Sequence, residues 1–257
     1  MNEPLRVVIT GASSGLGRAL AEEFSRRGAT LGLIARRREL LDSLAARLRV
    51  RCYTYAVDVR DADALARAGR DFLQQAGCPD VVIANAGVSA GTETWRPADN
   101  AMFEEILAIN VTGLMLTFQP FVDAMREAAR GTLVGIASVA GFRGLPGAAA
   151  YCASKSAAMT YLESLRVELR GSGVRVLTVC PGYIDTPMTA VNRYRMPFLM
   201  SSETAARSIA DSIGRKRRFY VLPWQMAVLG WFLRHLPRPL YEFAFAQAPR
   251  KPRRDQA

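Results

Sequence analysis

The chain reads Thr10-Gly11-Ala12-Ser13-Ser14-Gly15-Leu16-Gly17 close to its N-terminus, directly after an apolar run and at the start of a stretch of helical period. Glycines permit a tight turn and a close approach of the backbone to a pyrophosphate. The N–H groups and the dipole of a helix N-terminus attract that anion. In this strand-to-helix setting the motif predicts a dinucleotide-binding loop, with Gly11, Ser13, Ser14, Gly15, Leu16 and Gly17 as its binding residues.

Beyond this loop, apolar runs alternate with amphipathic stretches through the first 180 residues. Alternating βα units predict an α/β fold, a single doubly wound Rossmann-type domain with helices on both faces of a parallel sheet. The predicted strands are Leu5–Thr10, Thr30–Ala35, Arg51–Val57, Asp80–Ala84, Thr132–Ser138 and Val174–Cys180, with Phe219–Leu222 as a seventh. The predicted helices include Gly15–Arg27, Arg38–Leu48, Ala62–Gln75 and Tyr151–Leu169. Ligands of such sheets bind beyond the carboxyl ends of the strands.

The length of 257 residues suits one such domain. We expect a nucleotide-binding catalytic domain over residues 1–222, with a substrate loop at about 183–202, and a basic, apolar C-terminal extension over residues 223–257. The four cysteines and the single histidine show no metal-ligand spacing, so we expect no metal site. An early acid and a short first apolar run argue against a signal peptide, and we expect a cytoplasmic chain.

The net charge of +11 is concentrated at the C-terminal end. From Arg215 onward ten Lys or Arg residues stand against two acids, whereas residues 1–214 carry 24 basic and 21 acidic side chains. The basic end mixes its charges with Trp, Phe and Tyr, and with Val, Leu and Met rather than Gly and Ser. This mixture favours an anionic membrane surface over a nucleic acid. We therefore expect no nucleic-acid partner, and we consider a peripheral position on the inner membrane face.

The apolar run Phe219–Leu233 has 15 residues, which is too few for a bilayer span of about 20. Two interpretations of the extension stay open. It lies in a membrane interface, with Trp224, Trp231 and Tyr241 at headgroup depth, or it forms an extra helix over the substrate cleft or against a partner subunit. Either interpretation brings apolar surface near the substrate loop and predicts a bulky apolar substrate.

A run of three cations, Arg36-Arg37-Arg38, follows the second predicted strand. Dinucleotide-binding folds that use NAD carry an acid there, roughly 20 residues past the glycines, to bond the ribose 2′-OH. Cations at a helix start oppose the helix dipole, at a cost of about 0.3 to 1 kcal/mol each, and a bound anion would remove that cost. A ribose 2′-phosphate held by Arg36, with Arg37 or the Ser14 hydroxyl beside it, explains the run and favours NADP(H).

Further motifs follow in a fixed order: Asp58 after the third strand, Asn85-Ala86-Gly87 after the fourth, Asn110 in Ile-Asn-Val-Thr-Gly, Ser138 after the fifth, Tyr151-Cys-Ala-Ser-Lys155, and Pro181-Gly182 after the sixth. With the glycine loop, they resemble the short-chain dehydrogenase/reductase family in its compact form, over nearly everything up to residue 190. The resemblance implies a catalytic tetrad of Asn110, Ser138, Tyr151 and Lys155. It also implies cofactor contacts from Asp58, Val59, Asn85, Ala86, Gly87, Tyr151, Lys155, Pro181, Gly182, Ile184 and Thr186.

Independent chemistry supports the proposed roles of Tyr151, Lys155 and Ser138. Reduction of a carbonyl needs a proton donor for the developing alkoxide, and a tyrosine phenol can donate that proton. Lys155 lies four residues after Tyr151, so both side chains project from one helix face. We expect the ammonium to favour phenolate and to lower the pKa of Tyr151. Ser138 can hydrogen-bond the substrate oxygen as charge develops on it.

These observations predict an NADPH-dependent oxidoreductase that interconverts a carbonyl and an alcohol on an apolar small molecule. Two alternatives are an NAD-dependent alcohol dehydrogenase and a non-catalytic protein that senses NADPH. The missing acid after the second strand argues against the first alternative. The Ser138, Tyr151 and Lys155 set argues against the second, because a sensor needs no proton donor. The family resemblance further implies a homo-oligomer, either a dimer or a tetramer.

Overall fold

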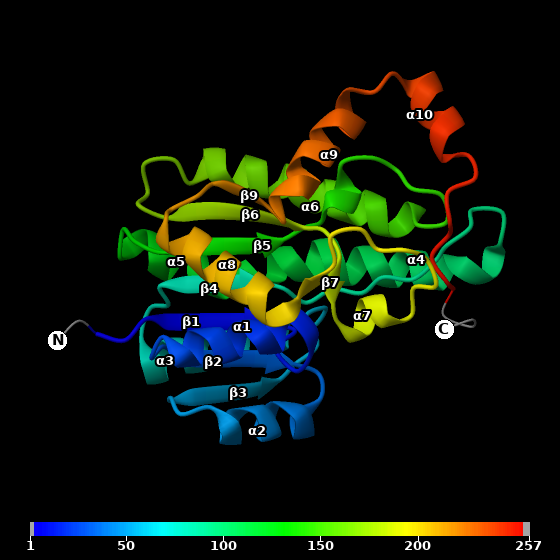
Figure 1. The fold of residues 1–257 in the computed structure, drawn as a ribbon. Helices are drawn as coiled ribbons and strands as arrows, with labels where there is room; N and C mark the ends of the chain where they lie inside the picture. The colour runs from blue at the N-terminus through cyan, green and yellow to red at the C-terminus, as the bar shows by residue number, and fades with distance from the viewer. Residues whose placement is uncertain (1–2, 254–257) are drawn as a thin grey trace.

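The computed structural model describes residues 3–253 of the chain and is built on a seven-stranded sheet, in the order β3-β2-β1-β4-β5-β6-β9 (Figure 1). All neighbouring strands pair in parallel. The strands are β1 Arg6–Thr10, β2 Thr30–Ala35, β3 Cys52–Ala56, β4 Val81–Ala84, β5 Thr132–Ile136, β6 Arg175–Pro181 and β9 Phe219–Leu222. The strand order reverses at β1, between β2 and β4, and in such sheets the crevice at this reversal holds the ligand.

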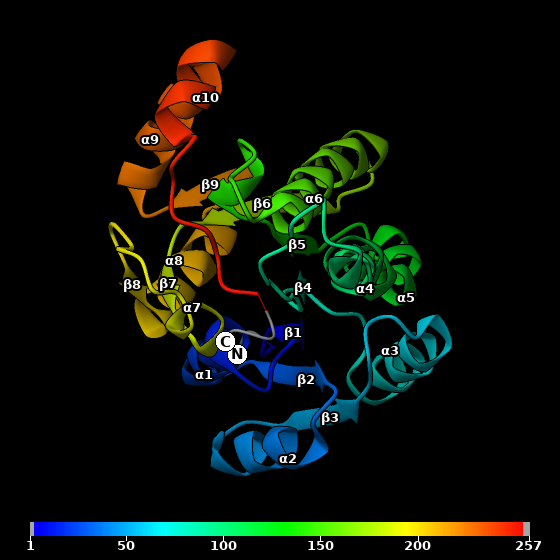
Figure 2. The ribbon, with the colours of Figure 1, turned by 90° about the vertical axis from the view of Figure 1, so that its right-hand side faces the viewer.

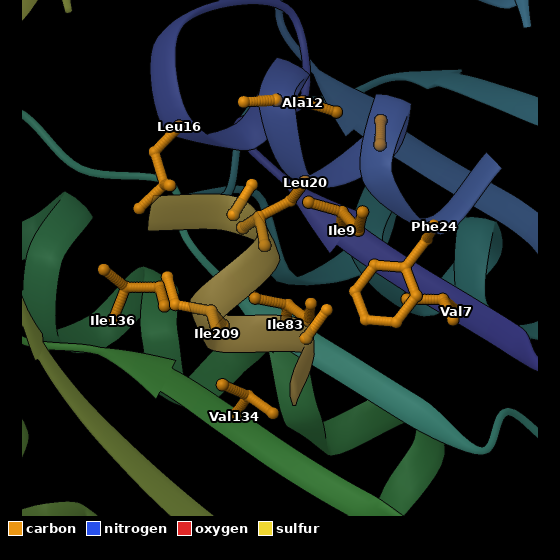
Figure 3. Packing of buried hydrophobic residues seen from close by; sticks show 14 of the residues in the cluster. Val7, Ile9, Ala12, Leu16, Leu20, Phe24, Ile83, Val134, Ile136 and Ile209 are labelled. Atoms are coloured by element: carbon orange, nitrogen blue, oxygen red, sulfur yellow. The ribbon is translucent and has the colours of Figure 1, made fainter. Parts of the chain in front are cut away.

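Helices cover both faces of the sheet, and each face has its own apolar core. On one face α1 and α8 pack together, and Leu20, Phe24 and Ile209 lie over Ile9 and Ile83 (Figure 3). The helices of the molecule are α1 Gly15–Arg26, α2 Arg38–Arg47, α3 Ala62–Ala76, α4 Asn100–Leu107, α5 Gly113–Glu127, α6 Ala149–Glu168, α7 Pro187–Ala190, α8 Ser202–Gly214, α9 Trp224–His235 and α10 Arg238–Phe245. Residues of this apolar core are buried because the strands carry apolar side chains on both faces, as is usual for a parallel sheet that is covered by helices.

The opposite face carries α3, α5 and α6 over a second core. Phe72 of α3 meets Phe121 of α5 edge to face, with ring centroids 6.3 Å apart. The helical run from Pro97 to Glu127, which contains α4 and α5, is the one described helix long and apolar enough to cross a membrane by length and composition. Its α5 segment packs on β4 and α3, which identifies the run as a core element of this fold.

The predicted fold class is confirmed, and the predicted bounds of strands and helices agree with the structure within two residues. The predicted substrate loop contains three short elements, the strand β7 Ile184–Asp185, the helix α7 and the strand β8 Met200–Ser201, and β7 pairs with β8. Elements of two to four residues are too short to produce a periodic pattern, and the sequence therefore indicates only a loop there.

After β9 the chain forms α9 and α10 and then returns across the carboxyl ends of the strands (Figure 2). The α9 helix passes so close to Phe142 that a Cβ atom on Gly230 would overlap the phenyl ring. Tyr241 of α10 donates a hydrogen bond from its hydroxyl to the carbonyl oxygen of Gly144 at 2.6 Å. The extension is thus docked on the loop between β5 and α6, beside the edge of the sheet where a ligand would bind.

Candidate active site

Two adjoining cavities lie at the carboxyl ends of the strands, and Ser138 and Tyr151 line both of them. The first, which we call the glycine-loop cavity, has a volume of about 280 Å³. Its lining includes every residue predicted to contact the cofactor: Gly11, Ser13, Ser14, Gly15, Leu16, Gly17, Arg36, Arg37, Asp58, Val59, Asn85, Ala86, Gly87, Tyr151, Lys155, Pro181, Gly182, Ile184 and Thr186. The fold therefore gathers these scattered residues around one space, as their positions at strand ends led us to expect.

The glycine loop leaves room for a ligand at the start of α1. Gly11 and Gly15 have φ angles of +67° and +52°, which L side chains rarely adopt. A Cβ atom on Gly17 would overlap the carbonyl oxygen of Gly11, so the helix can start this close to the turn only with glycine. The N-cap residue of α1, Ser14, makes no capping bond with its side chain, and the first turn carries no acid. This arrangement suits the anionic phosphates of a dinucleotide.

The arginines after β2 divide between two partners. The Arg37 guanidinium donates to the hydroxyl oxygens of Ser14 and Ser13, at 3.1 and 3.3 Å. Arg36 instead approaches Asp58, with 3.9 Å between Nη1 and Oδ2. Asp58 is already paired with Arg60, whose hydrogen bonds lower the pKa of that carboxyl. Arg37, which the sequence interpretation placed second to Arg36, thus has the closer contact with the glycine loop.

The proton-transfer group consists of Tyr151 and Lys155 on α6 with Ser138 just after β5. The Ser138 hydroxyl accepts a hydrogen bond from the Ala140 N–H at 3.1 Å and interacts with Tyr151. Lys155 is only 4% exposed, and its Nζ lies 5.7 Å from the centroid of the Tyr151 ring. It donates to the carbonyl oxygen of Ile136 at 2.8 Å. The helical spacing of the pair therefore places both side chains at the wall shared by the two cavities.

The prediction that Lys155 lowers the pKa of Tyr151 is wrong. Burial raises the pKa of Tyr151 to about 12, and the hydrogen bond with Ser138 acts in the opposite direction but is weaker. Burial also lowers the pKa of Lys155 to about 8. The ammonium faces the carbonyl of Ile136, and the cost of desolvating both groups exceeds their mutual effect. At neutral pH the pair is a neutral phenol beside an ammonium.

Asn110 lies beneath the glycine-loop cavity rather than in its lining. It is 1% exposed and sits in a π-helical turn, Ala108–Thr112, between α4 and α5. Its amide accepts from the Val88 N–H at 2.9 Å and donates to the carbonyl oxygen of Val88 and to the Ser154 hydroxyl, both at 3.0 Å. These bonds hold the segment after β4 against α6. The catalytic role of Asn110, which the family resemblance implies, stays a prediction.

Two other predicted residues shape the glycine-loop cavity from opposite sides. The Asn85 amide donates to the carbonyl oxygen of Thr10 at 3.0 Å and thereby fixes the glycine loop to the end of β4. Thr186 faces the loop from the N-terminus of α7, where a Cβ atom on Gly15 would meet its methyl group at 3.2 Å. Among residues 3–253, no group of three or more His, Cys, Asp or Glu side chains could hold a metal ion.

The second cavity, which we call the tail cavity, has a volume of about 330 Å³ and extends from Tyr151 toward the C-terminal extension. The extension contributes Met226, Leu229, Gly230, Leu233, Phe245, Ala248, Pro249 and Lys251 to its lining. The substrate loop contributes Tyr183, Met188, Thr189, Asn192, Tyr194, Arg195 and Pro197. The extension thus lies over the cavity beside Tyr151, and its contact with a membrane stays a prediction. Lys251 was not singled out from the sequence, although lysine is rare in this arginine-rich chain.

Comparisons with known proteins agree with this architecture. The family model described as short chain dehydrogenase matches residues 6–196. An uncharacterized oxidoreductase of Myxococcus xanthus is 42% identical over 92% of this chain and 94% of that protein. The 2-(R)-hydroxypropyl-CoM dehydrogenase of Xanthobacter autotrophicus is 35% identical over 71% of this chain and 75% of that protein.

Among solved structures, a short chain dehydrogenase/reductase of Burkholderia phymatum in complex with NAD has the same fold, with a TM-score of 0.83 and 23% identity. The alignment covers 97% of this chain and 98% of that one. The chain therefore belongs to the short-chain dehydrogenase/reductase family, whose members are oxidoreductases that bind a nicotinamide cofactor and act on carbonyl or alcohol groups.

Proposed function

We propose that this protein reduces the carbonyl group of an apolar small molecule with NADPH, and that Tyr151 donates the proton. The observation that carries the proposal is the position of Tyr151 and Ser138 at the wall between the glycine-loop cavity and the tail cavity. A substrate in the tail cavity would contact the Tyr151 phenol at the boundary with the glycine-loop cavity. Lys155 lies beneath the same wall and completes a set suited to proton transfer.

The proposed reaction assigns one task to each side chain. When bound, NADPH supplies a hydride, which forms the new C–H bond with its electron pair. Ser138 donates a hydrogen bond to the substrate oxygen and orients it. The phenol of Tyr151 would transfer its proton to that oxygen, so that the carbonyl, the hydride and the proton together form the alcohol. The Lys155 ammonium stabilises the phenolate left on Tyr151 until the proton is replaced from solvent.

A comparison of the wild type with Tyr151→Phe tests this mechanism. The variant keeps the ring but removes the proton donor, so we expect kcat to fall on the order of 10²- to 10⁴-fold. The assay is NADPH oxidation against apolar ketones and aldehydes of graded size. Thermal unfolding serves as the control, because the variant should melt close to the wild type. Equal rates for the two proteins would refute the role of Tyr151.

The proposed preference for NADPH rests on the end of β2. Two hydroxyls and a guanidinium meet there, since Arg37 donates to Ser13 and Ser14, and Arg36 lines the same cavity. No carboxylate pairs with Arg37 among the described residues, so its charge is available to a 2′-phosphate. The sequence has no acid at the position where a ribose 2′-OH is usually bound.

Substitutions in the arginine run test the cofactor preference. We expect Arg36→Asp and Arg37→Asp each to raise KM for NADPH on the order of 10- to 100-fold, because each loses a charged hydrogen bond and adds a repulsive charge. KM for NADH should change far less. Arg38→Asp is the matched control, since Arg38 lies in the same run but outside the cavity lining. Similar losses for both cofactors would remove the role of the run.

The proposed apolar substrate rests on the lining of the tail cavity. Met226, Leu229 and Leu233 of α9 face it from one side, and Tyr183 and Met188 face it from the other. Pockets of this kind bind the apolar body of a ligand and leave orientation to a few polar groups. Ser138 and Tyr151 are two such groups, at the boundary with the glycine-loop cavity.

The proposed location at an anionic membrane surface rests on the outer side of the extension. Trp231 and Phe232 of α9 are 58% and 62% exposed, and Phe243 of α10 is 86% exposed. The exposed arginines Arg234 and Arg238 lie within these two helices, and Glu242 is the one acid in them. A short apolar surface with arginines near it suits a membrane that contains anionic lipid headgroups. A substrate dissolved in that membrane would be close to the tail cavity.

A further inference from the structure

The last described residues form a strap across the mouth of the tail cavity. We use this name for residues 249–253. The carbonyl oxygen of Pro252 accepts a hydrogen bond from the Gly91 N–H at 2.9 Å. Arg250 pairs with Glu93, with 2.6 Å between Nη1 and Oε1, and Arg253 pairs with Asp99, with 2.8 Å between Nη2 and Oδ1. Two ion pairs and a backbone bond therefore fix the strap to the segment after β4.

Lys251 lies between those two anchors, and its side chain lines the tail cavity. Its Nζ is 6.0 Å from the centroid of the Tyr151 ring and donates a long hydrogen bond, 3.4 Å, to the carbonyl oxygen of Met188. The sequence contains only three lysines, and the other two are Lys155 and Lys216. Two of the three therefore have their ammonium groups beside the same tyrosine.

The ammonium of Lys251 has no acidic partner among the described residues. The lining of the tail cavity includes Arg143 and Arg195 but neither Asp nor Glu. Glu93 and Asp99, the acids next to the strap, are bound by Arg250 and Arg253. Burial is the only cause that lowers the pKa of Lys251, to about 8, and no opposing charge acts on it. Lys251 is partly buried; a cation that is partly withdrawn from water without an acidic partner is costly, and an anion in the cavity would reduce that cost.

That anion is not a phosphate of the cofactor, because Lys251 lines the tail cavity and not the glycine-loop cavity. The remaining source is the molecule that occupies the tail cavity. We propose that Lys251 binds a carboxylate of the substrate close to its carbonyl group, so that the preferred substrates are oxo acids with an apolar chain. In this arrangement the carboxylate meets Lys251, the carbonyl oxygen meets Tyr151 and Ser138, and the chain lies along α9. This inference rests on the proposed carbonyl reduction.

The test compares 2-oxooctanoate and 3-oxooctanoate with the neutral ketone 2-octanone, each at saturating NADPH. We expect the wild type to prefer at least one of the acids. In Lys251→Met the ratio of kcat/KM for that acid to kcat/KM for the ketone should fall on the order of 10- to 100-fold, the size of one charged hydrogen bond. Lys251→Arg should keep most of the preference. Lys216→Met is the matched control, because Lys216 is an exposed lysine outside both cavities, and its ratio should equal that of the wild type.

A ratio that stays the same in Lys251→Met would overturn the inference. In that case any decrease in kcat/KM would be the same for the acid and the ketone. Lys251 would then affect the reaction only by its influence on Tyr151 or by holding the strap in place. Calorimetry separates this result from a failure of the proposed function. We expect octanoate to bind the NADP⁺-loaded wild type and to bind Lys251→Met at least tenfold more weakly. If octanoate affinity differs in this way but the protein reduces none of the three compounds, the proposed carbonyl reduction is refuted and the anion site at Lys251 is retained. Equal octanoate affinities would overturn the site.

Discussion

The protonation states of two residues affect how fast the proposed reaction can run in each direction. At neutral pH Tyr151, with a pKa of about 12, is a phenol, and Lys155, with a pKa of about 8, is an ammonium. A phenol can donate a proton but cannot accept one, so this pair suits reduction better than oxidation. Lys155 faces the carbonyl of Ile136 and the thiol of Cys180, and burial raises the pKa of that thiol to about 12. The Cys180 thiol therefore does not titrate near neutrality, whereas Lys251, whose Nζ lies 6.0 Å from the centroid of the Tyr151 ring, has a pKa of about 8.

The rate of reduction should therefore fall as pH rises through the pKa of Lys155. Below about pH 8 the ammonium is present and stabilises the phenolate left on Tyr151; above it that charge is lost, and kcat/KM should drop by up to about tenfold per pH unit. A pH profile with 2-octanone measures this. The fall should persist in Lys251→Met and vanish in Lys155→Met. A fall that vanished in Lys251→Met instead would assign the titration to Lys251.

At the scale of single elements, the start of α1 is shaped for a ligand at the expense of ordinary helix preference. Alanine is the better helix former, but a Cβ atom on Gly17 would overlap the carbonyl oxygen of Gly11 and lie 2.6 Å from the Asn85 amide nitrogen. The glycine therefore allows the helix, the turn and the end of β4 to approach one another closely. Its cost in helix propensity is offset by that contact.

Gly17→Ala should consequently weaken both the fold and cofactor binding. We expect a loss of about 1 to 3 kcal/mol in the free energy of unfolding, as in overpacked sites, and a clear rise in KM for NADPH. Gly214→Ala is the matched control. It lies in the last turn of α8 with no atom within 4 Å of the added carbon, and it should stabilise the protein by up to about 1 kcal/mol. Chemical denaturation of both variants measures the difference, and equal effects would contradict the close approach.

Much of the fold could be predicted because its elements have strong local patterns. The buried strands are continuous apolar runs, and α1, α2, α3 and α6 have clear helical periods, so their bounds were predicted within two residues. The relation of Asn110 to Val88 could not be predicted, because it depends on a π-helical turn that adds no pattern to the sequence. Lys251 was missed for a similar reason, since its position depends on a bond between residues as distant as Gly91 and Pro252.

At the scale of the whole molecule, α9 is apolar on two sides. Met226, Leu229 and Leu233 line the tail cavity, whereas Trp231 and Phe232 are exposed on the outside. A helix that is apolar all round is ordinarily buried in protein or in contact with lipid. The inner side of α9 lines the tail cavity, and the outer side is available for the proposed membrane contact.

We therefore expect the wild type to bind vesicles that contain phosphatidylglycerol and to bind neutral phosphatidylcholine vesicles weakly. The double variant Trp231→Ser/Phe232→Ser should bind anionic vesicles at least about tenfold more weakly, because it loses most of the apolar area that enters the interface. Val167→Ser is the matched control, since Val167 is 71% exposed on α6, away from the extension. Vesicle sedimentation and light scattering give the two readouts. A wild type that does not bind anionic vesicles would refute the membrane contact. A dimer that dissociates in the double variant would assign the outer side of α9 to a subunit contact.

The strap also affects how the protein should be produced. A purification tag fused to the C-terminus would follow Ala257, four residues after Arg253, whose guanidinium fixes the strap to Asp99 across the mouth of the tail cavity. A tag at the other end would be attached before β1, whose start lies on the opposite side of the molecule from the strap in Figure 1. Preparations that differ only in which end carries the tag should therefore differ in apparent KM for the carbonyl compound, and N-terminal tagging is the choice for kinetic work.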